Sequence, residues 1–165
     1  MTTTLTQLVT FRLGDDLFAA DISSVERVLR YQTPTPIPNV PPWIAGVVEY
    51  QKRVLPVIDM RSRFEMAAEP VRPETRFLVF HIGDDWIAAQ VDAVLEVISA
   101  LPAEVAPPPP LFRGLAGEYL RGVVRRKDRL IVLLDATRLL TATERLHLDA
   151  VIDERLIVEH SGEEA

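Results

Sequence analysis

Residues 9–28 read VTFRLGDDLFAADISSVERV, and residues 78–97 read LVFHIGDDWIAAQVDAVLEV. The two segments align without a gap, and five of the twelve positions that differ exchange one apolar residue for another. A match of this length within one chain indicates an internal repeat. Identical residues occupy eight aligned positions: Phe11/Phe80, Gly14/Gly83, Asp15/Asp84, Asp16/Asp85, Ala19/Ala88, Ala20/Ala89, Val25/Val94 and Val28/Val97.

A second pair of segments repeats in the same order. Residues 43–59 (WIAGVVEYQKRVLPVID) align without a gap with residues 119–135 (YLRGVVRRKDRLIVLLD). The first pair is offset by 69 positions and the second by 76, so the second copy has seven extra residues between its blocks. We therefore predict a tandem duplication, with a first barrel repeat over 7–65 and a second over 75–140. Residues 141–165 are expected to form a C-terminal helix, which begins near Thr143, and a tail.

Each block has the pattern of a β-hairpin. Gly-Asp-Asp at 14–16 and at 83–85 supplies turn residues between short apolar runs. In the second blocks, β-branched runs flank the polar turns at 51–53 and 127–128. Many short strands at regular spacing, twice over, predict a mainly β fold of two small barrels.

Four segments outside the hairpins are expected to adopt other structures. The spacing of Ile22, Val25, Val28 and Leu29 predicts a two-turn helix with one apolar face. Asp59 and Asp135 are expected to be N-caps of short helical turns over 60–64 and 136–140. The proline-rich segment 102–110 is predicted to be a stiff polyproline II connection.

The composition restricts the class of function. The chain has no cysteine, which excludes thiol nucleophiles and thiolate metal sites. The N-terminal residues lack the pattern of a signal peptide, and no apolar run approaches the length of a membrane-spanning helix. These features predict a cytoplasmic protein without direct membrane insertion. The net charge of −6 disfavours nucleic acid as a partner.

No catalytic or metal-binding constellation stands out. The histidines, His81, His147 and His160, show no ligand spacing, and no cofactor or metal is expected. The basic run from Arg121 to Arg129 is best explained as a solvated hairpin tip, with protein or nucleic-acid contact as alternatives. For the large aromatic residues Trp43, Trp86 and Tyr119 we expect core packing, with surface anchoring of a partner as the alternative.

The ordered motifs resemble the CheW-like adaptor family. The resemblance rests on the Gly-Asp-Asp hairpins, Asp21-Ile-Ser-Ser-Val-Glu-Arg-Val28, Pro36-Ile-Pro-Asn-Val-Pro41, Val54-Leu-Pro-Val-Ile-Asp59 and Arg129-Leu-Ile-Val-Leu-Leu-Asp135. It covers roughly residues 7–140. The resemblance implies a single domain over 1–165, made of two interlocked five-stranded SH3-like barrels that share a core.

The resemblance also implies a non-catalytic function. CheW proteins link the cytoplasmic tip of methyl-accepting chemoreceptors to the regulatory domain of a CheA-type histidine kinase. By position, receptor or kinase contacts fall on Val25, Gly46, Arg76 and Val97.

One segment departs from the family pattern. After Gly-Val the family commonly reads Asn-Leu-Arg-Gly, but this chain has Glu49, Tyr50, Gln51 and Lys52. The missing arginine removes a bidentate donor that an uncharged amide does not replace. We include these four residues in the expected partner-binding surface. The alternative function is therefore a specialised scaffold of a pilus-motility or other chemosensory pathway, which binds kinase or adaptor without standard receptor coupling.

Overall fold

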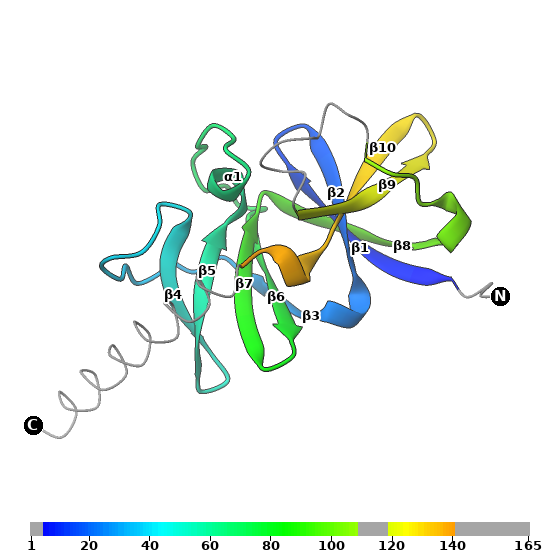
Figure 1. Cartoon of the computed structure of the whole chain (residues 1–165). Helices are drawn as coiled ribbons and strands as arrows, with labels where there is room; N and C mark the ends of the chain where they lie inside the picture. The colour runs from blue at the N-terminus through cyan, green and yellow to red at the C-terminus, as the bar shows by residue number, and fades with distance from the viewer. Residues whose placement is uncertain (1–4, 109–118, 141–165) are drawn as a thin grey trace, which may run out of the picture.

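The computed structural model describes residues 5–108 and 119–140. Within these residues the chain forms ten β-strands and a few short helical turns (Figure 1). The first repeat contains β1 (Thr6–Leu13), β2 (Asp16–Asp21), β3 (Val25–Arg30), β4 (Ile44–Tyr50), β5 (Arg53–Asp59) and α1 (Met60–Arg63). The second repeat contains β6 (Arg76–Ile82), β7 (Asp85–Val91), β8 (Ala93–Ala100), β9 (Leu120–Arg126) and β10 (Arg129–Leu134).

The strands form two five-stranded sheets, and each sheet takes strands from both repeats. One sheet has the order β8-β1-β2-β10-β9, which we call the β1 barrel, and the other has the order β3-β6-β7-β5-β4, the β6 barrel. Strands that are equivalent in the repeats occupy equivalent places in the two sheets. Each repeat therefore contributes its first hairpin to one barrel and its other three strands to the second barrel. The expected fold of two interlocked five-stranded barrels is confirmed.

Residues of the central strands alternate between two cores. A shared core takes side chains from both barrels, and each barrel also has an interior core of its own. In β6, Leu78 and Phe80 belong to the shared core, whereas Phe77 and Val79 fill the interior of the β6 barrel. All four are fully buried. Burial on both faces explains why these strands are continuous apolar runs in the sequence.

Hairpin turns with the predicted glycines join β1 to β2 and β6 to β7. Leu13 pairs with Asp16, so Gly14 is the first of two loop residues, and its φ is +62°. Gly83 has the same place in the second hairpin, with φ of +61°. A type II′ turn requires positive φ at this position, where glycine is free of steric cost.

The two predicted caps are confirmed. The Asp59 carboxylate accepts hydrogen bonds from the backbone N–H groups of Arg61 and Ser62 and caps α1. Asp135 accepts from the N–H of Thr137 and caps a 3₁₀ turn over Ala136–Arg138.

The helix predicted from Ile22 to Leu29 is wrong. Residues Ile22–Ser24 form one 3₁₀ turn, and Val25–Arg30 form β3. The register of β3 on β6 shifts between Val25 and Arg27, as in a β-bulge. An extra residue in a strand changes which residues face the core, so apolar residues there need not alternate strictly. Val28 is 42% exposed, so the spacing did not mark a buried helix face.

The proline-rich connection also differs from its prediction. Pro102–Glu104 form a 3₁₀ turn, in which Glu104 accepts from the N–H of Leu101, and Ala106 forms an isolated bridge with Val123. Proline fits the first turn of a helix because its φ is already helical and its missing N–H has no partner there. Residues 109–110, the helix expected from Thr143 and the tail over 141–165 lie outside the described residues.

No helix in the described parts of the chain is long and apolar enough to cross a membrane.

Candidate partner-binding surfaces

The residues expected to bind partners lie on the β3 and β8 strands, around the β4–β5 hairpin and at the start of β6. They are divided between the two sheets, since Val97 lies in the β1 barrel and the strand residues among the others lie in the β6 barrel. They are Val25 on β3, Val97 on β8, Gly46, Glu49 and Tyr50 on β4, Gln51 and Lys52 in the β4–β5 turn, and Arg76 on β6.

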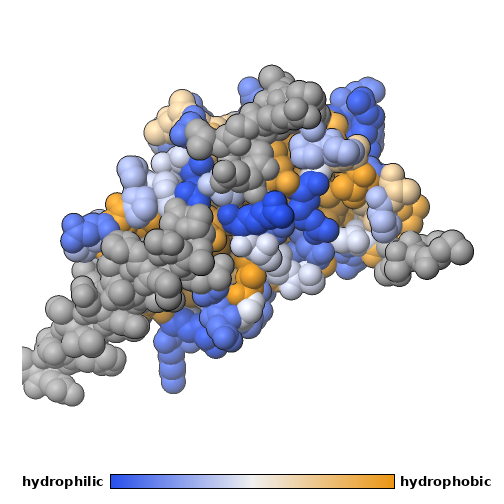
Figure 2. All heavy atoms as spheres, in the orientation of Figure 1, coloured by the Kyte–Doolittle hydropathy of each residue, from blue (hydrophilic) through white to orange (hydrophobic). Residues whose placement is uncertain are grey.

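Val25 and Val97 differ in exposure. Val25 pairs with Phe80 of β6 and is partly buried against the shared core. Val97 pairs with Val9 of β1 but is 50% exposed, and Leu95 on the same strand is 49% exposed. β8 is a sheet edge, where exposed apolar residues are normally avoided unless another surface covers them. Orange spheres gather at the right of Figure 2, over the barrel that contains β8.

The β4–β5 turn holds two residues in a strained backbone conformation. Tyr50 pairs with Arg53, which leaves Gln51 and Lys52 as the two loop residues. Their φ angles are +48° and +64°, the pattern of a type I′ turn. Asparagine and glycine are the usual residues of this turn, so the observed pair carries a conformational cost. Glu49, Gln51 and Lys52 are exposed, whereas Tyr50 is buried.

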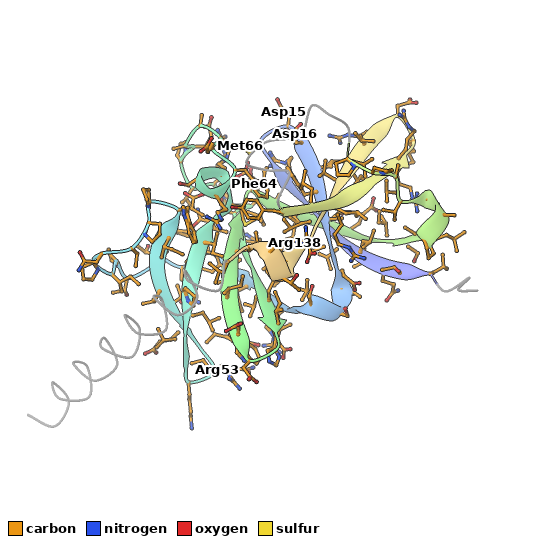
Figure 3. All side chains as sticks on the ribbon, viewed as in Figure 1. Asp15, Asp16, Arg53, Phe64, Met66 and Arg138 are labelled. Atoms are coloured by element: carbon orange, nitrogen blue, oxygen red, sulfur yellow. The ribbon has the colours of Figure 1, made fainter. Side chains whose placement is uncertain are left out.

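Trp86 lies beside this turn with a cation on its ring. The Arg53 guanidinium carbon is 4.2 Å from the Trp86 ring centroid, and the His81 ring stacks on Trp86 with centroids 4.0 Å apart. Figure 3 places Arg53 at the tip of the β4–β5 hairpin. Tyr50 packs against Trp86 from the barrel interior, with ring centroids 6.3 Å apart. Trp86 is thus partly buried against the core and partly at the surface. It combines the core packing expected from the sequence with the exposure that the alternative, anchoring of a partner, would need.

Gly46 is buried, so a partner would not touch it directly. Its φ is +144°, and a Cβ atom there would lie 2.3 Å from the carbonyl oxygen of Thr35. Thr35 bridges to Val47 with two backbone hydrogen bonds of 2.8 and 2.9 Å. Gly46 therefore allows the segment before β4 to lie against the strand. The equivalent Gly122 does the same, since its Cβ would lie 2.5 Å from the oxygen of Ala106.

A salt bridge that sequence reasoning missed connects the barrels. The Arg61 Nε and Nη2 atoms donate to the Asp92 carboxylate at 2.9 and 2.5 Å, and the Gly14 N–H donates to it at 2.7 Å. Partial burial alone would raise the pKa of Asp92. The hydrogen bonds from Arg61 and Gly14 outweigh burial and hold the pKa below its usual range.

A second missed contact joins the repeats near their equivalent aromatic residues. The Arg63 guanidinium carbon lies 3.8 Å from the Trp43 ring centroid and 4.8 Å from that of Tyr119. Arg63 also donates to the Leu139 carbonyl oxygen at 2.8 Å. Phe64, labelled in Figure 3, follows Arg63 in the chain. Its ring stacks on that of Tyr119, with centroids 5.8 Å apart. The only sequence signal was that Trp43 and Tyr119 are equivalent in the two repeats.

The basic hairpin tip is partly neutralised. Arg126 donates to the Glu104 carboxylate at 2.6 Å and to the carbonyl oxygen of Ser99. The Leu101 N–H and Arg126 together hold the pKa of Glu104 below its usual range. Arg125 and Arg129 remain exposed. With one arginine engaged inside the protein and Asp128 in the turn, the tip lacks the concentrated charge of a nucleic-acid site.

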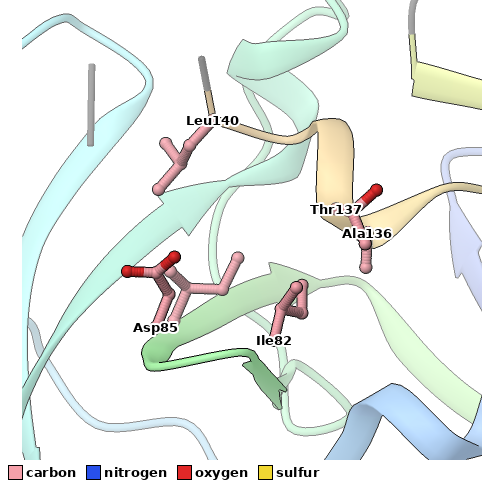
Figure 4. A pocket seen from close by; sticks show the side chains of 6 residues that line it. Ile82, Asp85, Ala136, Thr137 and Leu140 are labelled. Carbon is pink, nitrogen blue, oxygen red and sulfur yellow. The ribbon is translucent and has the colours of Figure 1, made fainter. Parts of the chain in front are cut away.

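A small pocket between the β6–β7 turn and the 3₁₀ turn after β10 has no room for a ligand. Figure 4 shows Ile82, Asp85, Ala136, Thr137 and Leu140 around it, and its volume is about 10 Å³. A space of this size holds at most one water molecule. No three His, Cys, Asp or Glu side chains converge on a possible metal position anywhere in residues 5–108 and 119–140.

Comparisons with known proteins agree with this architecture. A family model for the CheW-like domain matches residues 7–144. The chemotaxis protein CheW of Treponema pallidum (strain Nichols) is 28% identical over 142 residues, which cover 84% of this chain and 84% of that protein. Protein FrzA of Myxococcus xanthus is 34% identical over 138 residues, 82% of this chain and 86% of that protein.

A solved structure has the same fold over nearly its full length. The crystal structure of the scaffolding protein TtCheW from Thermoanaerobacter tengcongensis matches with a TM-score of 0.78 and 26% sequence identity, over 86% of this chain and 96% of that one. Since the family model spans most of the chain and both barrels, the chain belongs to the CheW-like family.

Proposed function

We propose that this protein is a cytoplasmic, non-catalytic adaptor that couples chemoreceptors to a CheA-type histidine kinase. Membership of the CheW-like family is the observation that carries the proposal. The expected partners are the regulatory domain of the kinase and the cytoplasmic tip of the receptor, and the proposal involves no cofactor. Binding free energy would hold the two partners in register, so that the receptor state biases the kinase through their contacts.

The exposed apolar side chains of β8 support a protein-binding role. Val97 and Leu95 are each about half exposed on an edge strand. Burying such groups against a partner is favourable by roughly 25 cal/mol per Å² of apolar surface. The surface around Val97 is therefore our candidate for the receptor contact.

Calorimetric titration with the regulatory domain of a CheA-type kinase tests the adaptor role directly. We expect one-to-one binding with a dissociation constant in the low micromolar range. Absence of binding to every such kinase of the same genome would contradict the proposal and leave the fold assignment intact.

A matched pair of variants tests the receptor surface. Val97→Asp removes an exposed apolar group and adds a charge, and we expect receptor-tip binding to fall at least tenfold. Ser99→Asp, two residues along the same strand, adds the same charge without removing apolar surface, and we expect a smaller loss. Equal losses would show that the charge alone is responsible and would remove Val97 from the site.

The second candidate is a scaffold that binds kinase or another adaptor without standard receptor coupling. One observation favours it: the Glu49–Lys52 segment departs from the family pattern. If it is right, Gln51→Arg should gain affinity for a receptor tip. Strong receptor binding by the unchanged protein would exclude it.

A further inference from the structure

Two arginines face each other across neighbouring strands of the β6 barrel. Arg30 at the end of β3 and Arg76 at the start of β6 are directly paired in the antiparallel register. Within the described residues neither arginine forms an ion pair with a carboxylate. Like charges directly opposite each other destabilise a sheet. An arginine pair at this place thus has a cost in the free protein.

The fold itself does not require this pair. The equivalent residues of the β1 barrel are Ser99 and Gln7, which are paired in the same register on β8 and β1. An uncharged pair is therefore compatible with the same strand geometry in the same molecule. The arginines are explained more readily by something that binds to them.

A third arginine completes an open pocket around this pair. Arg30, Arg72 and Arg76 line a cavity of about 390 Å³ together with Tyr31, Val71, Pro73 and Thr75. Among the residues that the structure describes, no acidic side chain lines it. The nearest acidic residues along the chain are Glu69, which lies 3.8 Å from Arg72, and Glu74, which lies 3.8 Å from Arg12. Both are exposed and weakly paired, so the pocket keeps a positive character in a chain of net charge −6.

Local hydrogen bonds hold the Arg76 side chain and the Arg72 backbone in place. Arg76 Nη1 donates to the carbonyl oxygens of Pro73 and Thr75 at 2.8 and 2.9 Å, so its Nε and Nη2 donors remain for a ligand. The Arg72 N–H donates to the Thr75 hydroxyl at 3.0 Å, and the Thr75 N–H donates to the Arg72 carbonyl oxygen. The Arg76 guanidinium, which these bonds hold, loses less conformational entropy when it binds a ligand.

We propose that Arg30, Arg72 and Arg76 form a docking pocket for an acidic segment of a partner protein. Guanidinium groups bind carboxylate and phosphate oxyanions through paired N–H donors. Val71, which is 47% exposed, and the Tyr31 ring give the pocket an apolar wall that a peptide can cover and a free anion cannot. This inference rests on the proposed adaptor function and deepens it, because it assigns a ligand chemistry to the surface around Arg76.

The test uses three fluorescein-labelled hexapeptides: Glu-only, Gln-only, and one that carries two phosphoserines. Fluorescence anisotropy with the full chain at low ionic strength measures their binding. We expect the Glu-only or the phosphoserine peptide to bind, and the arm that binds more tightly identifies the oxyanion. We expect the Gln-only peptide not to bind, and inorganic phosphate to compete poorly.

The most informative variant replaces Arg30 and Arg76 by the residue types found at the equivalent positions of the β1 barrel. Arg30→Ser with Arg76→Gln should weaken acidic-peptide binding at least tenfold, because both guanidinium groups of the pair are removed. The control Arg125→Gln with Arg129→Ser removes the same charge from the β9–β10 hairpin and should change binding less than twofold. Equal losses in both double variants, or no acidic-peptide binding by the unchanged protein, would overturn the pocket.

Titration of each variant with the kinase regulatory domain separates the two proposals. If the unchanged protein binds kinase but not acidic peptide, the adaptor function stands and the arginine pocket is wrong. If acidic peptide binds through these arginines while no kinase does, the pocket stands and the kinase-coupling function is wrong.

Discussion

The β1 barrel and the β6 barrel place different residues at equivalent positions of the same strand scheme. Where the β6 barrel pairs Arg30 with Arg76, the β1 barrel pairs Ser99 with Gln7. In the β6 barrel the Arg53 guanidinium lies over the Trp86 ring, whereas the residue equivalent to Trp86 in the β1 barrel is Leu17. Buried positions such as Phe11/Phe80, Ala19/Ala88 and Ala20/Ala89 are identical in the two copies.

The contacts between the barrels are also unequal on the two sides. Arg61, Asp92 and Gly14 form a salt-bridged contact, but their equivalents in the repeat are Thr137, Ser23 and Gly83. Buried positions such as Phe11/Phe80 and Ala19/Ala88 are thus preserved in both copies, whereas several surface positions differ. Positions where the copies differ are the ones to examine for partner recognition.

The largest expected effect concerns a feature that both copies share. Gly46→Ala should destabilise the protein by about 3 kcal/mol or more, because the new Cβ meets the Thr35 oxygen and the residue has a forbidden φ. Gly122→Ala meets an oxygen without the φ penalty, and we expect about 2 kcal/mol. Gly83→Ala has nothing within 4 Å and should cost about 1 kcal/mol from its positive φ alone. Urea denaturation measures all three, and equal losses would refute the close approach as their cause.

The next effect concerns the contact that joins the copies. Arg63→Ala removes a guanidinium held between Trp43 and Tyr119 and its hydrogen bond to Leu139, and should cost about 2–3 kcal/mol. Arg63→Lys keeps the charge but loses the planar stack, so we expect only partial rescue. Arg138→Ala is the control, since that side chain is 64% exposed and should lose less than about 0.5 kcal/mol. Thermal unfolding measures the series.

The Arg61–Asp92 salt bridge, which has no equivalent in the other copy, predicts that the stability of the protein depends on pH. The pKa of Asp92 is lower in the folded protein than in the unfolded chain, so its contribution is present above the unfolded pKa of about 4 and is lost as pH falls through the folded value. Asp92→Asn should therefore cost about 1–2 kcal/mol at pH 7 and little at about pH 2. The exposed Asp84→Asn should have no such effect. A pH-independent loss in Asp92→Asn would contradict an ionic origin.

The smallest effect concerns the strained turn of the first copy. Replacing Gln51 and Lys52 by Asn and Gly removes a backbone cost and should stabilise the protein by about 0.5–1 kcal/mol. The hairpin of the second copy tests how general this cost is, because Lys127 also has a positive φ of +54°. Lys127→Gly should give a similar gain. If the Gln51 and Lys52 changes destabilise the protein, these side chains make contacts that outweigh the strain.

Local sequence patterns were sufficient for the hairpins, the caps and the duplication. Gly14 and Gly83 mark turns because few other residues adopt positive φ, and Asp59 and Asp135 mark helix starts because a carboxylate satisfies free N–H groups there. Each of these rules involves residues within a few positions of one another. The prediction failed at residues 25–30, where pairing with β6, some fifty residues later, outweighed the local spacing.

The sequence by itself therefore determined the number of copies, the hairpins and the family. Only the tertiary structure decided which strands share a sheet, because equivalent strands of two similar repeats have similar apolar patterns and either copy could supply the partner. The tertiary structure also decided which side chains form the pairs that differ between the two copies. Arg30 meets Arg76, and Arg61 meets Asp92, only after the strands of one repeat have paired with those of the other.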